Sequence, residues 1–169
     1  MASAAPATTV IAKTFRSVAT EADAVFAGTV REVRSYRRDD DRIWTAVRFG
    51  ELRWLAGGSG EETELEFAGG QVGDRAEMIG GMPRFTVGQR VVLFVRDAPS
   101  ISPVVGFHQG CYALRETGAG DIVVTPDARP VRAVDGDELV LGESGGEDGM
   151  SLDAFAEVVA EMRRGRSNP

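Results

Sequence analysis

Short stretches of alternating or wholly apolar residues dominate the middle of the chain and predict a mainly β fold. The run Val91–Val95 contains no polar residue. Its length and its β-branched content are typical of a strand that is covered on both faces. Strict alternation over Ile43–Phe49 and Thr63–Ala68 is typical of strands with one face toward the core. We therefore expect Val91–Val95 to lie at the centre of a sheet built from such strands.

Two irregularities in the pattern indicate how this sheet curves. The first predicted strand, Ala24–Val33, is interrupted by Gly28, and a glycine inside a strand commonly marks a bulge or a sharp bend. In the second strand, Ile43–Trp54, the alternation changes phase near Gly50, which also indicates a bulge. Small barrels need such bends in order to close. The pattern therefore predicts a closed antiparallel β-barrel of the OB type.

The rest of the β region is predicted from shorter signals. We expect strands over Val104–Phe107 and Gln109–Arg115, followed by a hairpin that turns through Thr117–Gly120. A second hairpin is predicted around Asp135-Gly136, with strands over 131–134 and 138–141.

A helix is predicted at each end of this β region. Apolar residues at helical spacing run from Val10 to Ala22, and a second apolar stripe follows Ser151, which can cap a helix over Leu152–Arg164. We therefore predict a disordered tail over residues 1–9, an OB-like barrel domain over residues 10–141, a flexible acidic linker over residues 142–150, and a C-terminal helix over residues 151–165 that packs on the barrel.

Composition narrows the classes of function. The formal net charge is −7, whereas nucleic-acid binders usually carry a basic face, so the charge argues against that class. The single cysteine, Cys111, excludes an intrachain disulfide. No stretch approaches the roughly 20 apolar residues of a membrane helix, so we expect no membrane span.

The residue types that carry catalysis are too few to form a recognisable site. His108 and Cys111 are the only histidine and cysteine, and in an unbulged strand residues three apart point to opposite faces. A zinc site needs three or four ligands, and no Gly-x-Ser-x-Gly nucleophile elbow is present. We predict no catalytic residue, no metal and no cofactor, while a pair of carboxylates set by the fold stays open.

A long connection rich in glycine is the first candidate for a binding surface. The segment Gly69–Arg84 has five glycines and one proline in sixteen residues. Loops of this length in small domains are often functional. The alternative is a cover over one end of the barrel.

Three motifs resemble a known fold family. Residues Ala22–Val30 read A-D-A-V-F-A-G-T-V and resemble the A-D-x-V-x-x-G-x-V opening of netrin-like domains and tissue inhibitors of metalloproteases. Ile43–Val47, with Leu55 and Gly57-Gly58 after it, resembles their second strand and its turn, although the lysine of that turn is absent here. Phe85–Phe94 resembles their fourth strand.

A closer resemblance is to a group of uncharacterised secreted bacterial proteins. These combine the first-strand motif with G-G-x-V-G, G-x-P-x-F and V-G-x-x-Q-G, which stand here at Gly69–Gly73, Gly81–Phe85 and Val105–Gly110. The resemblance covers about residues 20–115 and implies a netrin-like, TIMP-like OB fold. Some such bacterial proteins are associated with matrixin-like metalloproteases, which makes a metalloprotease one candidate partner.

The resemblance stops where inhibition of a protease would be decided. Inhibitors of the tissue type place an N-terminal cysteine, held by disulfides, on the protease zinc, and this chain has no such cysteine. What the resemblance implies is therefore the fold and a secreted or periplasmic binding role. The small residues after Met1 resemble the sequence around a signal-peptide cleavage site, which fits a leader that was removed before Met1 was added. The alternative is a flexible N-terminus of a cytosolic protein.

Three functions are compatible with these observations. The first is a non-catalytic binding or regulatory module whose partner is another protein. The second is an OB-type binder of single-stranded nucleic acid, which would stack bases on Trp44 and Trp54 beside Arg48 and Arg53. The third is an unrecognised hydrolase. We favour the first. Its predicted binding residues are Gly69, Gly70, Val72, Gly73, Met82, Pro83 and Phe85 of the loop, with His108 and Gln109 beside them. The motifs name neither a particular ligand nor an oligomeric state.

Overall fold

The computed structural model describes residues 11–98 and 100–164, and within these residues strands predominate. The elements in chain order are α1 (Phe15–Glu21), β1 (Ala24–Arg37), β2 (Ile43–Ala56), β3 (Thr63–Ala68), β4 (Gly70–Val72), β5 (Arg75–Glu77), β6 (Arg90–Val95), the 3-10 helix η1 (Phe107–Gly110), β7 (Cys111–Thr117), β8 (Gly120–Val124), β9 (Val131–Asp135), β10 (Glu138–Leu141) and α2 (Leu152–Arg164). The predicted mainly β class with a helix toward each end is confirmed.

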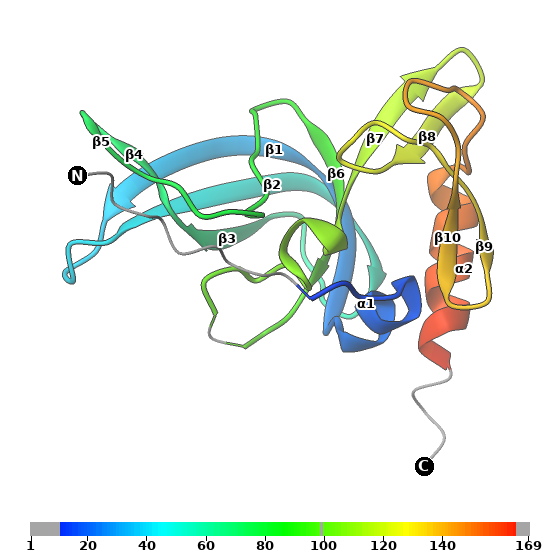
Figure 1. The fold of residues 1–169 in the computed structure, drawn as a ribbon, viewed down its shortest axis with the longest axis horizontal. Coiled ribbons are helices and arrows are strands. Elements are labelled where there is room, and N and C mark those ends of the chain that lie inside the picture. The colour runs from blue at the N-terminus through cyan, green and yellow to red at the C-terminus, as the bar shows by residue number, and fades with distance from the viewer. Residues whose placement is uncertain (1–10, 99, 165–169) are drawn as a thin grey trace.

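One six-stranded antiparallel sheet organises the molecule. Its strand order is β3-β2-β1-β6-β7-β8, and all neighbours run antiparallel. The two longest strands, β1 and β2, have 14 residues each and arch along the sheet (Figure 1). The helices and the hairpin β9–β10 lie toward one end of this arch, and the small hairpin β4–β5 lies at the other.

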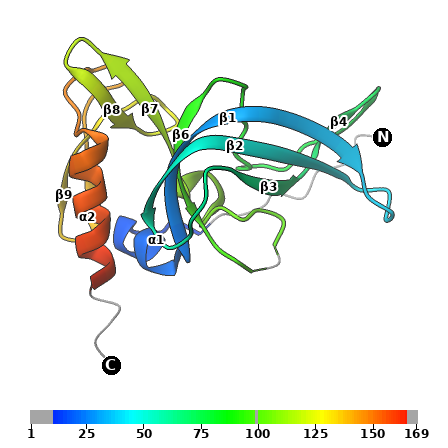
Figure 2. The same cartoon turned by 180° about the vertical axis from the view of Figure 1, so that it is seen from behind.

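The prediction of a closed barrel is wrong. The edge strands β3 and β8 do not pair with each other and lie at opposite sides of the sheet (Figure 2). Part of each free edge is occupied by a loop instead. The amide of Ala68 at the end of β3 donates to the carbonyl of Ile101, 2.8 Å away. Along β8, Ile122 bridges Ser151 and Val124 bridges Pro130. These contacts take hydrogen-bonding groups that a closing pair of strands would have used.

The prediction that Val91–Val95 is covered on both faces is confirmed. Val92 and Phe94 belong to the cluster beneath the helices. Val91 and Leu93 belong to the cluster on the concave face. All four side chains are fully buried. Alternating side chains of one strand therefore fill two separate cores, which is why the run has no polar position.

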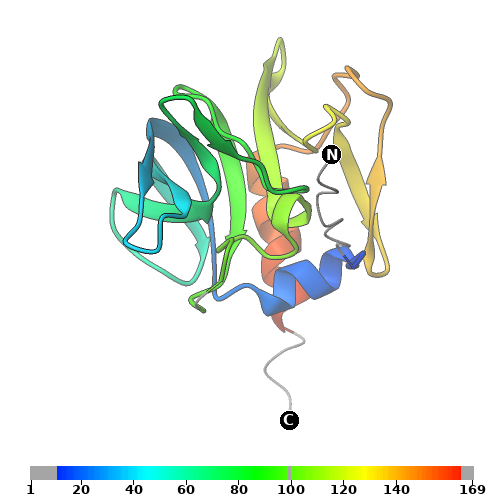
Figure 3. The same cartoon turned by 60° about the vertical axis from the view of Figure 1, so that its left-hand side comes forward.

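The helix-side core is a cluster of aromatic rings. Phe15 of α1, Phe155 of α2, and Phe94 and Tyr112 of the sheet have ring centroids 5.4 to 6.4 Å apart, a range in which aromatic pairs attract one another. Arg163 near the end of α2 donates to the carbonyl oxygens of Ala19 and Ala22, at 2.8 and 2.6 Å. The C-terminal helix is thus docked on α1 and on the sheet (Figure 3).

Both predicted irregularities are present in the strands. The register between β1 and β2 shifts between Ala27 and Thr29, that is, at Gly28. A Cβ atom at Gly28 would lie 2.6 Å from Cδ2 of Leu52 and 3.2 Å from the carbonyl oxygen of Gly50, so any other residue at the bend would have to displace the side chain of Leu52. Opposite this point, Glu51 has a φ of 54°, which accounts for the change of phase near Gly50.

Two other predicted elements are corrected. The first helix begins at Phe15, because residues 11–14, which the prediction included, are not helical. Thr14 is its N-cap and accepts from the amide of Ser17 at 3.1 Å, and Ile11 is 79% exposed. The predicted strand Val104–Phe107 is a single bridge at Val104 followed by η1.

The C-terminal third matches its predicted elements but not their placement. The hairpin β9–β10 lies within one residue of its predicted bounds, since β9 runs to Asp135 and not to Val134, but it forms its own two-stranded sheet outside the main one. Segment 142–150, expected as a flexible linker, is hydrogen-bonded on both sides: Met150 donates to Val131 at 2.7 Å and accepts from Val123 at 3.0 Å. The predicted tail over residues 1–9 and residue 165 lie outside the described residues.

Candidate functional site

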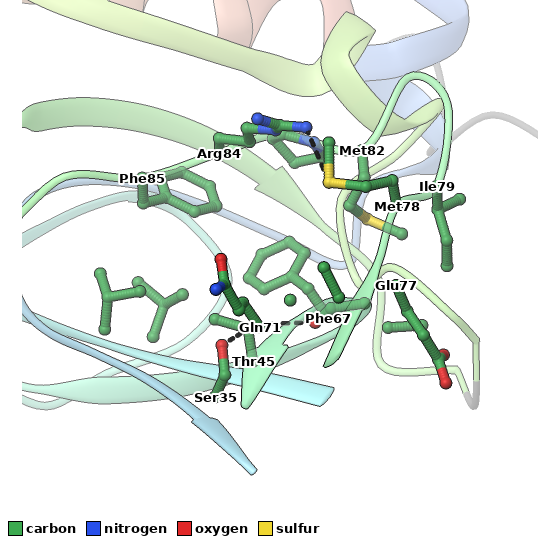
Figure 4. A pocket seen from close by; sticks show the side chains of 17 residues that line it. Ser35, Thr45, Phe67, Gln71, Glu77, Met78, Ile79, Met82, Arg84 and Phe85 are labelled. Carbon is green, nitrogen blue, oxygen red and sulfur yellow. Dashed lines mark hydrogen bonds between the residues drawn. The ribbon is translucent and has the colours of Figure 1, made fainter. Parts of the chain in front are cut away.

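A half-open cavity of about 280 Å³ lies on the concave side of the sheet, at the end that carries the hairpin β4–β5 (Figure 4). Its lining comes from two sources. The ends of β1, β2 and β3 supply the base, and the chain from Gly69 to Phe85 supplies the walls and mouth. The long glycine-rich loop therefore does not merely cover the sheet. It encloses a cavity against the sheet.

The base of the cavity is aromatic and aliphatic. Phe85 packs against Phe67 with ring centroids 5.2 Å apart, and against Phe49 at 5.4 Å in an edge-on arrangement. Phe67 and Val47 are buried strand residues that also line the cavity. Because Phe49 and Phe67 belong to the concave core, the ring of Phe85 ties the end of the loop to the fold.

The start of the loop is fixed by a polar contact. The hydroxyl of Thr45 donates to the carbonyl of Gly69 at 2.7 Å and lies 2.9 Å from the hydroxyl of Ser35. Gly70 has a φ of +135°, and a Cβ atom there would lie 2.3 Å from Oγ1 of Thr45 and 2.5 Å from Oγ of Ser35. Only glycine lets the chain pass this close to the two hydroxyls.

Charged side chains connect the hairpin β4–β5 to the tip of β1 and β2. Arg75 pairs with Asp41 at 2.5 Å and with Glu77 at 3.5 Å. Arg42 pairs with Glu77 at 3.0 Å. The hydrogen bond from Arg75 holds the pKa of Asp41 below its ordinary value, and Arg37 acts in the same direction. The carboxylate of Glu77 points away from the aromatic base (Figure 4) and pairs with these two arginines.

The mouth of the cavity combines thioethers with one arginine. Met78 is 68% exposed, and Met82 and Ile79 line the same opening. A guanidinium nitrogen of Arg84 lies 3.2 Å from the sulfur of Met78 (Figure 4). Exposed apolar side chains around a concave apolar surface are typical of a site that contacts another molecule.

The predicted loop residues fall into two groups. Gly69, Gly70, Met82, Pro83 and Phe85 all line the cavity. The other two predicted loop residues, Val72 and Gly73, lie at the turn that joins β4 to β5 and are not in the lining. The structure thus brings together five of the seven predicted loop residues.

The two predicted residues outside the loop do not line the cavity. His108 is exposed on η1. The amide side chain of Gln109 binds the backbone before α1: it accepts from the amide of Lys13 at 2.7 Å and donates to the carbonyl of Ile11 at 3.0 Å. Gln109 therefore holds the N-terminal segment on the fold.

Several lining residues were not predicted. Val33, Ser35 and Thr45 come from β1 and β2, and Met78 and Arg84 come from the loop. The loop pair had a signal in the sequence, because Met78-Ile79 is an apolar step inside an otherwise polar and glycine-rich stretch. Ser35 had none, because the first strand was expected to end at Val33 and runs on to Arg37.

The candidate nucleophile is in an unreactive environment. Cys111 is 8% exposed, and burial raises the pKa of its thiol to about 12, so little thiolate forms near neutral pH. Among residues 11–98 and 100–164, no group of three or more His, Cys, Asp or Glu side chains is placed to hold a metal ion. Neither described helix is long and apolar enough to cross a membrane.

The aromatic residues considered for base stacking are engaged within the protein. The indole nitrogen of Trp54 donates to the carbonyl of Gly60 at 2.9 Å, and its ring lies 5.3 Å from that of Phe26. The guanidinium of Arg38 lies 3.6 Å from the ring centroid of Trp44. The two arginines beside them are paired with carboxylates, Arg48 with Glu32 and Arg53 with Asp153.

Comparison with known proteins finds no matching family model, no matching curated protein and no matching solved structure.

Proposed function

We propose that this protein is a non-catalytic binding or regulatory module that holds part of another protein in the cavity formed by Gly69–Phe85. The observation that carries the proposal is the cavity itself, which joins an apolar base to a mouth where Met78 is exposed and Ile79 and Met82 are half-buried. Its two ends are anchored, by the close contact of Gly70 with β1 and β2 and by the packing of Phe85. A preformed and anchored site loses little conformational freedom when it binds.

The rest of the proposal comes from the resemblance. We place the module outside the cytoplasm, secreted or periplasmic, with a metalloprotease as one candidate partner. The strand order supports an OB-like origin. In a five-stranded Greek-key barrel, β1, β2, β3, β6 and β7 would be strands one to five. Opening such a barrel between its third and fifth strands gives the neighbour order β3-β2-β1-β6-β7 that is present here. The second candidate function, binding of single-stranded nucleic acid, has no observation in its favour, because Trp44 and Trp54 already contact other residues of the protein.

The test uses peptides as probes and methionine methyl groups as reporters. Peptides selected from a random displayed library against the whole protein are added to protein labelled with ¹³C at the methionine methyls. Met78 and Met82 line the cavity, whereas Met150 and Met162 pack in the helix-side core. We expect the signals of Met78 and Met82 to move and those of Met150 and Met162 to stay.

Two exposed apolar side chains provide a matched pair of variants. Met78 is 68% exposed at the mouth of the cavity, and Val87 is 61% exposed in the next turn and does not line it. Both can be changed to alanine with little cost to folding, because each is already mostly in water. Met78→Ala should weaken peptide binding about tenfold, and Val87→Ala should not. Selected peptides that leave the Met78 and Met82 signals in place would remove this function from the cavity.

A further inference from the structure

Arg84 lacks the kind of partner that nearly all other described arginines of this protein have. Within the described residues, every arginine except Arg84 and Arg164 contacts a carboxylate or a backbone carbonyl oxygen. Arg84 contacts the thioether of Met78, and a thioether is only a weak acceptor. In a chain of net charge −7, an arginine left without a carboxylate at the mouth of a cavity is an available site for an anion.

The backbone beside Arg84 also has unused hydrogen-bonding groups. Pro83 fixes its own φ and disfavours a helical conformation at Met82, which favours an extended backbone in this stretch. No hydrogen bond within the described residues involves the amides of Arg84 and Phe85 or the carbonyls of Met82, Pro83 and Arg84. An extended stretch with open amides and carbonyls can pair with a second extended chain.

The size of the cavity limits what can fill it. A volume of about 280 Å³ is just below the roughly 300 to 1,000 Å³ of sites for drug-sized ligands. It suits one large apolar side chain better than a whole ligand of that size. Aromatic and aliphatic groups of Phe67, Phe85 and Val47 would surround such a side chain.

These three observations point to one kind of occupant, and the inference rests on the function proposed above. We propose that the cavity recognises an extended segment of a protein partner that carries a large apolar residue with an aspartate or glutamate within two positions of it. The apolar side chain fills the cavity. The carboxylate pairs with Arg84, and the backbone of the segment pairs with Met82–Phe85. The carboxylate can form a bidentate hydrogen-bonded pair with the guanidinium.

The first test is the sequence pattern of selected peptides. Peptides selected against the wild-type protein should share a large apolar residue with an acidic residue at one of the two positions on either side. The same library selected against Arg84→Gln should keep the apolar residue and lose the acidic preference. Arg34→Gln is the matched control. Arg34 is also exposed, and it lies between two cavity-lining residues of β1, so its side chain points to the opposite face.

A double-mutant cycle measures the ion pair directly. We expect Arg84→Gln to weaken binding of an acidic peptide about fivefold and Arg34→Gln to leave it within a factor of two, in line with exposed ion pairs. Replacing the acidic residue of the peptide by its amide should weaken binding to the wild-type protein by a similar factor and have little further effect on Arg84→Gln.

The outcomes separate the two proposals. Two results would overturn the role of Arg84 and leave the binding function in place. In the first, peptides move the signals of Met78 and Met82 but show no acidic preference. In the second, they bind Arg84→Gln and Arg34→Gln equally. A library that yields no binder, or binders that do not move Met78 and Met82, counts against both. Octanoate that moves the Met78 and Met82 signals and binds more tightly than every selected peptide would show a site for a small amphiphile and overturn the peptide proposal.

Discussion

Substituting alanine for Gly70 tests how the cavity is built. The backbone of Gly70 has a φ of +135°, where a side chain costs of the order of 1 to 3 kcal/mol in strain. The new Cβ would also lie 2.3 Å from Oγ1 of Thr45 and 2.5 Å from Oγ of Ser35. Moving these hydroxyls breaks their mutual hydrogen bond or the bond to Gly69, which costs about 1 kcal/mol more. Together these effects predict a destabilisation of about 2 to 4 kcal/mol.

Urea unfolding followed by tryptophan fluorescence provides the measurement. Trp44 pairs with Ala68, two residues before Gly70, so its emission reports on this end of the sheet. With a slope of about 2 kcal/mol per molar urea, the midpoint should fall by about 1 to 2 M. Gly80→Ala is the control, because a Cβ atom at Gly80 would meet no other atom within 4 Å and the φ of Gly80 is not positive. It should leave the midpoint unchanged or raise it slightly.

The two contributions can be separated. A triple variant that adds Ser35→Ala and Thr45→Ala to Gly70→Ala removes the two hydroxyls in the clash but not the backbone strain. It should be compared with the double variant Ser35→Ala and Thr45→Ala, and the remaining difference should be about 1 to 3 kcal/mol. A midpoint for Gly70→Ala that is no lower than that for Gly80→Ala would refute the reasoning, because the loop would then not depend on close contact with β1 and β2.

Two further predictions concern residues outside the cavity. Gln109→Ala removes the side chain that holds Ile11 and Lys13, at a cost of roughly 1 to 1.5 kcal/mol. Tryptic cleavage after Lys13, followed by mass spectrometry, should therefore become about tenfold faster. The neighbouring variant His108→Ala should be cleaved like the wild type, and equal rates for both variants would show that Gln109 does not hold this segment. The thiol of Cys111, with its pKa raised to about 12 by burial, should be ionised in only about one molecule in ten thousand at pH 8. A disulfide reagent should therefore react with it only in unfolding concentrations of urea, and rapid reaction in the native state at pH 8 would contradict the burial.

Local patterns were enough to predict most strands. Thr63–Ala68 was predicted at its observed bounds, and the hairpin around Asp135-Gly136 was predicted within one residue of its own. Alternation and turn residues act over a few positions, so a short stretch of sequence contains the whole signal. Gly28 is a similar case. It was recognised as a bend because glycine inside a strand seldom has another purpose, and it lies at a register shift.

Features that depend on distant contacts could not be predicted in the same way. At the end of β3, the amide of Ala68 pairs with the carbonyl of Ile101 and not with another strand of the sheet, and nothing in the sequence near Ala68 shows this. Val10 and Ile11 look like the start of a helix because they continue its apolar spacing, yet Ile11 is held by Gln109 of η1, 98 residues further along the chain. The cavity contains both a feature that local sequence predicts and a feature that depends on distant contacts. Its glycine-rich loop was recognised, whereas Ser35 was missed because the length of β1 depends on pairing with β2.

The arrangement of the two cores separates the stability of the fold from the chemistry of the site. Packing of α1 and α2 on one face of the sheet involves no residue that lines the cavity. On the concave face the loop is attached at its two ends, by Gly70 and by Phe85, while Met78 and Arg84 between these points are exposed. Substitutions at these exposed positions can therefore change what is bound with little effect on folding. Substitutions at the two attachment points should alter folding and binding together.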